Sequence, residues 1–197
     1  WSWPDLKALG AIHAHENPIA SVSFSPDGLY LATACGQGEV KLWDVKAGSL
    51  VTYVKRGLPP VHALGFSADG TNLGVALSTG DVVLYSPKYP EPIVLPCHDG
   101  IVNGIAFSPF GDIMATGGND STMQLWSINR QTRLHEVQAH RRSVQSLRFS
   151  PDGKLLASCS NDLTAKVWDV AAGLELRIFR GHGAMVWDIS FCNNPDL

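Results

Sequence analysis

Charged residues are scarce in this sequence of 197 residues: they make up 17% of the chain, and the net charge is only −3. Non-specific binding to nucleic acid depends on Lys and Arg side chains that neutralise several phosphates, so this balance argues against a nucleic-acid partner. No apolar run reaches the length of about 18 residues that a membrane-spanning helix needs, and we expect no membrane insertion. The chain also lacks a recognisable signal peptide and an initiator Met, so we interpret it as a trimmed or internal fragment.

Paired cysteine motifs are also missing. The chain has four cysteines, none of them spaced as C-x-x-C: Cys35, Cys97, Cys159 and Cys192. This pattern favours neither a disulfide framework nor a zinc knuckle, and it indicates buried, reduced thiols in an intracellular protein, cytoplasmic or nuclear. Cys97, beside His98, could be a reactive thiol in a surface loop.

What the sequence does contain is a repeat. A segment of the type Phe-Ser-Pro-Asp-Gly recurs at separations of 42, 41 and 42 residues, beginning at Phe24, Phe66, Phe107 and Phe149. An aromatic residue closes each unit at the same intervals: Trp43, Tyr85, Trp126 and Trp168. A period of about 40 to 45 residues with Gly-His and Trp-Asp pairs is typical of a four-stranded propeller blade.

The repeat predicts an all-β fold, a β-propeller of four-stranded antiparallel blades with four full blades and a partial blade at each end. The full blades are expected at residues 15–56, 57–97 (a degenerate unit), 98–139 and 140–181. Residues 1–14 would hold the outer strand of a preceding blade, at 6–12, and residues 182–197 the start of a further blade, with a strand at 185–191. In the first two full blades the expected strands are 19–24, 29–35, 39–43, 50–55, 61–66, 72–77, 81–85 and 93–95. We expect no helix longer than a turn.

These repeats resemble the WD-repeat (WD40) β-propeller family over essentially the whole chain. Because such rings usually have about seven blades, the resemblance implies that further blades of this chain, or another chain, complete the ring. It also implies a buried relay of hydrogen bonds in each blade that joins His, Ser or Thr, Asp and Trp. The matching residues are His140, Ser158, Asp162 and Trp168 in the fourth unit, His98, Thr116, Asp120 and Trp126 in the third, and His15, Thr33 and Trp43 in the first, where Gln37 replaces Asp.

The second unit has Gly57, Val75, Thr79 and Tyr85 at the relay positions, so it has lost the relay. All members changed together, which is the less costly way to lose a buried polar network. We expect this blade to be locally softer than the others.

A set of Ser, His and Asp also resembles a hydrolase triad. A nucleophile must be exposed and singular, whereas this set recurs once per blade and ends in an indole N–H donor; a satisfied buried network of this kind rigidifies a sheet. We therefore predict no enzyme activity, no cofactor and no metal, and we treat His15, His98, His140 and His182 as structural residues. A propeller enzyme would need convergent carboxylates, histidines or a metal on the loops that face the channel.

In WD-repeat proteins the face around the central channel commonly holds peptides or partner domains. Carrying those positions over gives residues on either side of the Val or Ile in the first strand of each blade, or just before the relay Asp: Ile101, Asn103, Gln145, Met185, Trp187, His62, Asn119 and Asn161, together with Pro18, Ala20, Pro60, Ser143, Gly36 and Ser78. Trp187 and Met185 stand out, because aromatic residues and Met are favoured interface anchors. They could instead plug the channel or pack on the next blade. Arg141 and Arg142 could pair with an acidic or phosphorylated segment, or form a solvated loop.

The sequence thus predicts a non-catalytic scaffold or adaptor that docks proteins or peptides, a subunit of a multiprotein complex with no small-molecule substrate. The alternatives are a substrate receptor of a ubiquitin ligase and a subunit of an RNA-processing, ciliary or chromatin assembly, which differ in partner and not in fold. The Trp-Asp-x-Arg ending of some ligase adaptors is absent, since Lys46 and Ala171 stand where Arg would.

Overall fold

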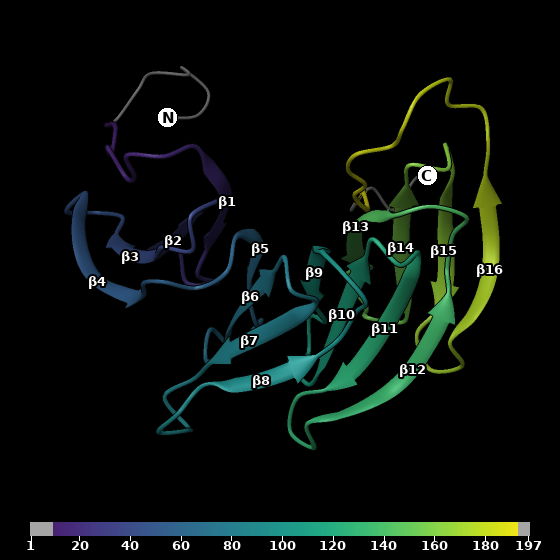
Figure 1. The fold of residues 1–197 in the computed structure, drawn as a ribbon. Coiled ribbons are helices and arrows are strands. Elements are labelled where there is room, and N and C mark those ends of the chain that lie inside the picture. The colour runs from purple at the N-terminus through teal and green to yellow at the C-terminus, as the bar shows by residue number, and fades with distance from the viewer. Residues whose placement is uncertain (1–9, 193–197) are drawn as a thin grey trace.

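The computed structural model describes residues 10–192 of the chain, and residues 1–9 and 193–197 lie outside this description. Within residues 10–192 every helix or strand is a β-strand. The strands form four separate four-stranded sheets, which stand side by side along an arc (Figure 1).

Each sheet contains four consecutive strands. The first sheet is β1 Ile19–Phe24, β2 Tyr30–Cys35, β3 Val40–Asp44 and β4 Ser49–Lys55, and the second is β5 Val61–Phe66, β6 Leu73–Leu77, β7 Asp81–Tyr85 and β8 Ile93–Pro96. The third sheet is β9 Val102–Phe107, β10 Ile113–Gly118, β11 Thr122–Ser127 and β12 Thr132–Gln138, and the fourth is β13 Val144–Phe149, β14 Leu155–Ser160, β15 Ala165–Asp169 and β16 Leu174–Phe179.

Each sheet is an antiparallel meander, because its strands hydrogen-bond in chain order. The register repeats from sheet to sheet: Val22 lies opposite Thr33 in the first sheet, and Leu147 lies opposite Ser158 in the fourth. The expected all-β architecture of four-stranded antiparallel blades is confirmed. In the first two sheets the strand ends fall within one residue of those predicted from the sequence.

A repeated turn reverses the first strand of each sheet into the second. In the first sheet the N–H of Gly28 donates to the carbonyl of Ser25 over 2.9 Å, and the Ser25 hydroxyl donates to Asp27 over 2.5 Å. Gly28 has a φ of 71°, a left-handed conformation that costs glycine little. In the third sheet Phe110 stands at the Asp position, and its ring is 78% exposed.

A second turn, between β6 and β7, depends on a close approach at Gly80. This residue has a φ of 97°, and its carbonyl accepts the N–H groups of Cys97 and His98 over 3.0 and 2.9 Å. A Cβ atom at Gly80 would lie 2.0 Å from the carbonyl oxygen of His98. With the backbone in this conformation, a side chain at residue 80 would collide with the His98 carbonyl; the third sheet makes the matching pair of bonds through Ser121, at a smaller φ of 69°.

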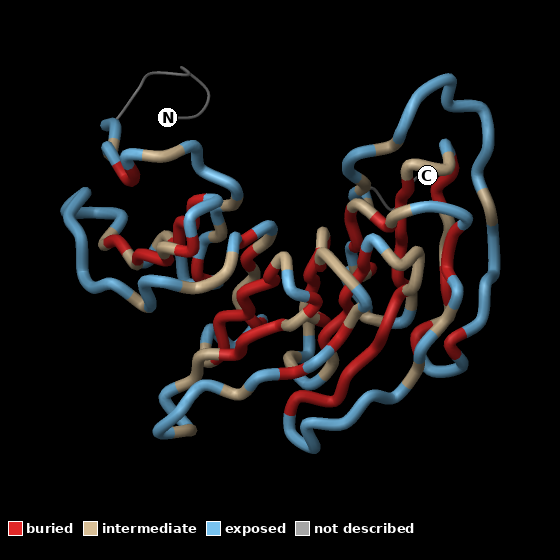
Figure 2. The backbone as a smooth tube through the Cα atoms, viewed as in Figure 1, coloured by how far each residue is buried: buried red, intermediate tan, exposed pale blue. Residues whose placement is uncertain are grey.

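Neighbouring sheets pack through the first strand of one against the sheet before it. Ile105 and Phe107 of β9 lie against Gly74 of β6, where a Cβ would be 2.4 Å from the Cδ1 atom of Ile105. Figure 2 shows that burial follows the two middle strands of each sheet, whereas β1, β4, β12 and β16 are largely exposed. Fully buried side chains such as Leu84 and Leu147 each stabilise the fold by about 1.5–3 kcal/mol.

Within the described parts of the expected partial blades, residues 10–14 and 182–192, no strand forms. The predicted strand at 185–191 is wrong, because the structure assigns no strand there; the segment instead lies along the fourth sheet, where the N–H of Val186 donates to the carbonyl of Ser160 over 3.1 Å. A strand needs a ladder of such bonds with a neighbour, and the described residues offer this segment no such ladder. Of the strand predicted at 6–12, residues 6–9 lie outside the description, and residues 10–12 are not a strand.

Three of the four cysteines are buried, as expected, but Cys97 is among them. The prediction that Cys97 is a reactive surface thiol is therefore wrong. Its burial raises the pKa of the thiol to about 12, and burial raises that of Cys159 to about 11, so both remain protonated. Cys192 is exposed.

In residues 10–192 the structure has no helix that is long and apolar enough to cross a membrane.

Candidate functional site

The fourth sheet contains a complete relay. His140 precedes β13, Ser158 lies on β14 and Trp168 on β15. The Nε2 atom of His140 is 2.8 Å from the Ser158 hydroxyl, which also accepts the indole N–H of Trp168 over 2.8 Å. On the other side of the imidazole, Nδ1 is 3.0 Å from Asp162 and 3.1 Å from the hydroxyl of Thr164. The relay thus joins the segment before the sheet to its second and third strands.

The third sheet repeats this arrangement except at its tryptophan. The Nε2 atom of His98 is 2.8 Å from the Thr116 hydroxyl, and Nδ1 is 3.0 Å from Asp120. The indole N–H of Trp126 is buried without a hydrogen-bond partner among the described residues, so the membership of Trp126 in the relay, which the resemblance implies, is wrong. The ring is held by packing instead, in an apolar cluster that includes Leu84.

The first sheet takes its carboxylate from an unexpected position. The Nε2 atom of His15 is 2.8 Å from the Thr33 hydroxyl, which also accepts the indole N–H of Trp43 over 2.9 Å. Gln37, at the expected Asp position, is exposed, and the carboxylate of Glu39 lies 3.3 Å from Nδ1 of His15. The sequence held a signal for this, since Glu39 stands at the position of Thr122 and Thr164, whose hydroxyls also lie beside Nδ1 of the relay His.

Glu39 is surrounded by cations. One carboxylate oxygen lies 3.2 Å from Nζ of Lys41 and the other 3.6 Å from Nε of Arg56. Lys41 also donates to the carbonyl of Ala14 over 2.7 Å, and the guanidinium of Arg56 stacks 3.6 Å from the ring centre of Tyr53. The hydrogen bond from Lys41 outweighs partial burial and lowers the pKa of Glu39, so this carboxyl is ionised near neutral pH.

The second sheet has no relay. Val75 is buried where the other sheets have Ser or Thr, and the hydroxyl of Thr79 donates to Asp81 over 2.8 Å instead. The described side chains at these positions leave no buried polar atom unpaired. That this blade is softer than its neighbours stays a prediction.

Burial and hydrogen bonding act in opposite directions on the relay of the fourth sheet. Burial lowers the pKa of His140, in spite of the neighbouring Asp162. Burial by itself raises the pKa of Asp162, but hydrogen bonds from Thr164 and the N–H of Arg141, together with His140, outweigh it and lower the pKa to about 2. These directions favour a neutral imidazole beside an ionised carboxylate near neutral pH. Such a pair is suited to holding strands together.

Among the partner candidates, those nearest the C-terminal end gather at one edge of the fourth sheet. Trp187 is 67% exposed and Met185 is 45% exposed. Between them and β13, the carboxylate of Asp188 accepts the hydroxyl of Ser146 over 2.6 Å. This contact brings the segment close to Gln145, which precedes Ser146 and is half-buried. Asp188 was missed in the sequence, where nothing distinguishes it from other surface acids.

The remaining candidates are spread over several sheets. The amide of Asn103 donates to Asn119 over 2.8 Å and to the carbonyl of Val144 over 3.0 Å, so it links the third and fourth sheets. Asn161 is half-buried, and within residues 10–192 its side-chain oxygen has no partner. Ile101 is half-buried, and the others are exposed: His62, Asn119, Arg141 and Arg142. Arg141 shares a hollow with Asp162 and Glu175, so carboxylates already lie near its charge.

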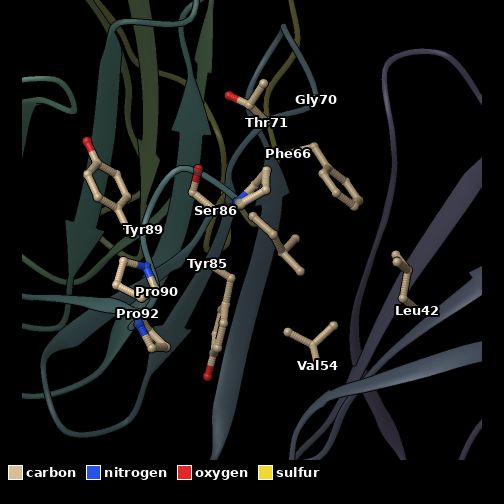
Figure 3. A pocket seen from close by; sticks show the side chains of 12 residues that line it. Leu42, Val54, Phe66, Gly70, Thr71, Tyr85, Ser86, Tyr89, Pro90 and Pro92 are labelled. Carbon is tan, nitrogen blue, oxygen red and sulfur yellow. The ribbon is translucent and has the colours of Figure 1, made fainter.

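An apolar groove of about 370 Å³ lies between the first and second sheets (Figure 3). Leu42 and Val54 line it from the first sheet, and Phe66 and Tyr85 from the second. The Pro-rich segment after β7 borders it through Tyr89, Pro90 and Pro92. The groove lies beside Tyr85, which replaces the Trp of the other units, and the sequence did not predict it.

Comparison with known proteins bears directly on this repeated architecture. The family described as "WD domain, G-beta repeat" matches residues 6–44, 91–127 and 131–169. These segments contain 39, 37 and 39 residues, which is 115 of 197 and more than half of the chain. The chain belongs to the WD40 repeat family. The matched segments include Trp43, Trp126 and Trp168 of the first, third and fourth WD40 units, and the unit without a relay falls mostly between them.

The WD40 relatives come from several kinds of complex. The chain is 33% identical to U3 small nucleolar RNA-associated protein 7 of Saccharomyces cerevisiae over 60% of this chain and 22% of that protein. It is 28% identical to cell division cycle 20.1, cofactor of APC complex, of Arabidopsis thaliana over 70% of this chain and 32% of that protein. It is 40% identical to small ribosomal subunit protein RACK1 of Schizosaccharomyces pombe over 21% of this chain and 13% of that protein. The chain thus matches less than a third of the length of each of these relatives.

The WD40 relay of the fourth sheet predicts a specific loss of stability in acid. The pKa of Asp162 is about 2 in the folded state against 3.8 ordinarily, so the unfolded chain takes up the proton first and acid favours unfolding. The contribution is present above pH 3.8 and is lost as the pH falls towards 2; a shift of this size is worth on the order of 2 kcal/mol.

We expect urea unfolding across this pH range to show wild type more stable than Asp162→Asn at neutral pH, with a gap that closes as the pH approaches 2. A gap that stays constant from neutral to acid pH would show that Asp162 does not act through its charge.

Proposed function

We propose that this WD40 chain is a non-catalytic scaffold that docks protein or peptide partners and serves as a subunit of a multiprotein complex. Membership of the WD40 family supports this proposal, as do relatives named for a nucleolar RNA-associated protein, a ribosomal subunit and an APC cofactor. The proposal that the chain is not an enzyme is supported by the His, Ser or Thr and Asp residues of the relays. They recur from sheet to sheet, and their Ser or Thr is buried where a substrate cannot reach it.

The observation that carries the docking proposal is the exposed pair Met185 and Trp187 at the edge of the fourth sheet. A Trp that leaves two thirds of its surface in water is costly unless a partner covers it, and Trp is among the residues most often found at the energetic centre of interfaces. The bond between Asp188 and Ser146 fixes this segment against β13, so the Trp is presented from a held backbone.

The test compares the partners that co-purify with wild-type protein and with a Trp187→Ala, Gln145→Ala double variant, measured by quantitative mass spectrometry under the same conditions. The expected result is the loss of at least one partner from the double variant, because interface Trp truncations often cost about 2 kcal/mol or more, a factor of about 30 in affinity. Circular dichroism verifies that the variant remains folded.

Phe110→Ala is the matched control. Phe110 is also an exposed aromatic residue, but it lies in the turn after β9, at the other end of the strands. It should leave the partner set unchanged. If the double variant keeps every partner, the docking site is not at this edge.

We further propose that the protein acts inside the cell, in the cytoplasm or nucleus, as the names of the relatives suggest. A second candidate function follows from the relative with 33% identity: a subunit of an RNA-processing particle, in which this chain contacts protein and not RNA. The net charge of −3 supports protein contacts over phosphate contacts. A role as substrate receptor of a ubiquitin ligase would use the same edge, and the identity of the partners separates the two.

A further blade would also explain the exposed face of the first sheet. Val22 and Phe24 of β1 are 55% and 59% exposed, whereas Leu64 and Leu147, at the position of Val22 in the second and fourth sheets, are buried against a neighbour. We propose that another WD40 blade, of this chain or of another, packs on Val22 and Phe24 to continue the ring.

A further inference from the structure

The relay of the first sheet differs from the others at three positions that lie side by side. Cys35 stands where the third and fourth sheets have Gly118 and Ser160, as their pairing with Ile19, Val102 and Val144 shows. By the same register, Gln37 stands where they have Asp, and Glu39 where they have Thr. The two replacements Cys35 and Glu39 put a thiol and a carboxylate near the His that every relay shares.

These groups converge on one point. The ligand atoms of His15, Cys35 and Glu39 all lie within 4.8 Å of one another, and Nδ1 of His15 is 3.3 Å from the Glu39 carboxylate. His15 and Cys35 are buried, while the Glu39 side chain is 32% exposed. The cluster is therefore enclosed on two sides and open to solvent through Glu39, which provides an entry path for an ion.

We propose that His15, Cys35 and Glu39 bind a zinc ion, with Nδ1, Sγ and a carboxylate oxygen as three ligands and water as the fourth. Zinc takes this mixture of nitrogen, sulfur and oxygen in a tetrahedron with bonds of about 2.0–2.3 Å, which sets ligand atoms about 3.3–3.5 Å apart. The distance between His15 and Glu39 already has this value. On binding, the Cys35 thiol loses its proton to solvent, and the sulfur coordinates as a thiolate.

The surroundings fit this role. Nε2 of His15 contacts the Thr33 hydroxyl over 2.8 Å, and a partner on the second ring nitrogen is what orients a ligating His and fixes its tautomer. If Nε2 carries the proton and donates it to Thr33, Nδ1 is left with a free lone pair for the metal. Thr33 can accept this bond beside that of Trp43, because a hydroxyl has two lone pairs.

The ammonium of Lys41, near Glu39, is the main opposing charge. Lys41 does not depend on Glu39 alone, since it also donates to the carbonyl of Ala14 and lies 5.2 Å from the ring centre of Tyr53. The thiolate formed at Cys35 adds a negative charge that offsets the incoming ion. Arg56 then holds the second carboxylate oxygen. The ammonium of Lys41, 3.2 Å from the oxygen that faces His15, gives up this contact when the metal binds and keeps those to Ala14 and Tyr53.

Zinc at this point would tie the segment that precedes β1 to the start of β3. It would do so in the sheet whose relay lacks the usual Asp. The inference departs from the expectation that His15 is only a relay residue and that the chain has no metal. It stands independently of the proposed docking function.

The test uses the 197-residue protein, purified under reducing conditions, stripped of metal and titrated with Zn²⁺ and then with Co²⁺. We expect one tightly bound zinc per chain by elemental analysis. Cobalt should give the intense visible bands of a tetrahedral site together with the near-ultraviolet band of a thiolate–cobalt bond. Zinc should also raise the melting temperature of wild type, because it binds the folded state.

Two variants restore residues that the other sheets carry at the same positions, so each should fold. Cys35→Ser introduces the residue found at 160 and should abolish the thiolate–cobalt band. Glu39→Thr introduces the residue found at 122 and 164. Each should weaken zinc binding at least about 100-fold, since loss of even an outer-shell partner costs 10- to 100-fold. Neither variant should gain thermal stability from zinc.

Cys192→Ala is the matched control, because Cys192 is the exposed thiol among residues 10–192 and the natural source of adventitious binding. It should bind metal as wild type does. Loss of the band in Cys192→Ala, its persistence in Cys35→Ser, or the failure of the wild-type protein to bind zinc would each overturn the assignment.

Discussion

Gly80→Ala is expected to destabilise the protein by more than about 3 kcal/mol, the range in which single substitutions often unfold a domain. Two effects combine. Alanine at a φ of 97° is strained, and its Cβ would lie 2.0 Å from the carbonyl oxygen of His98 and 3.1 Å from that of Gly100. To relieve the clash, the turn must shift towards the φ of 69° that Ser121 adopts at the matching position of the third sheet, while the Gly80 carbonyl keeps the N–H groups of Cys97 and His98. Urea unfolding, followed by tryptophan fluorescence, measures the loss.

Gly28→Ala separates the two effects. Gly28 also has a positive φ, of 71°, but a Cβ there would meet nothing within 4 Å. Only the cost of the left-handed conformation remains, about 1–2 kcal/mol. If the two substitutions cost the same, the close approach at Gly80 is not what requires glycine there.

Ser158→Ala is expected to cost about 3 kcal/mol, the second largest effect. The Ser158 hydroxyl serves two buried groups, the imidazole of His140 and the indole N–H of Trp168. Removing it leaves both without this partner, and each unsatisfied buried polar group costs about 1–3 kcal/mol. Equilibrium unfolding in urea provides the measurement, with the m-value as a test that the folded states are comparable.

Thr116→Val is the counterpart in the third sheet and should cost about half as much. Thr116 serves His98, but the indole N–H of Trp126 is already unpaired, so only one group loses its partner. Val keeps the shape of Thr, and the second sheet carries Val75 at this position naturally. Equal losses for Ser158→Ala and Thr116→Val would mean that Trp126 does take part in its relay.

The repeat predicted most of the fold because its turn residues form specific hydrogen bonds and backbone conformations. Ser, Asp and Gly of the turn at 25–28 each make the bond or adopt the φ that reverses the chain, so the strands on either side could be placed within one residue. The segment at 185–191 has the apolar pattern of a first strand but is not one. Strand formation depends on a hydrogen-bonding neighbour, which a local pattern does not show.

The relay was harder to predict than the strands, because membership depends on reach and not on residue type. Glu39 contacts His15 from the position that Thr122 and Thr164 occupy in the other relays, two residues beyond the exposed Gln37. Trp126 is the right residue in the right register, yet its ring settles by packing and its N–H finds no acceptor. A shift of a fraction of an ångström decides such a bond, and no sequence motif encodes it.

The sheets are joined mainly to their immediate neighbours, β1 to β5, β5 to β9 and β9 to β13. In a linear array of this kind, stability is a sum of unit and neighbour terms, and order can nucleate in any unit and propagate to the next. The third and fourth sheets are the one adjacent pair in which both sheets have a relay, so we expect order to nucleate there. Propagation must then cross the second sheet, where no relay assists, before it reaches the first. We therefore expect the blade without a relay to slow folding of the array, so that the third and fourth sheets fold before the first.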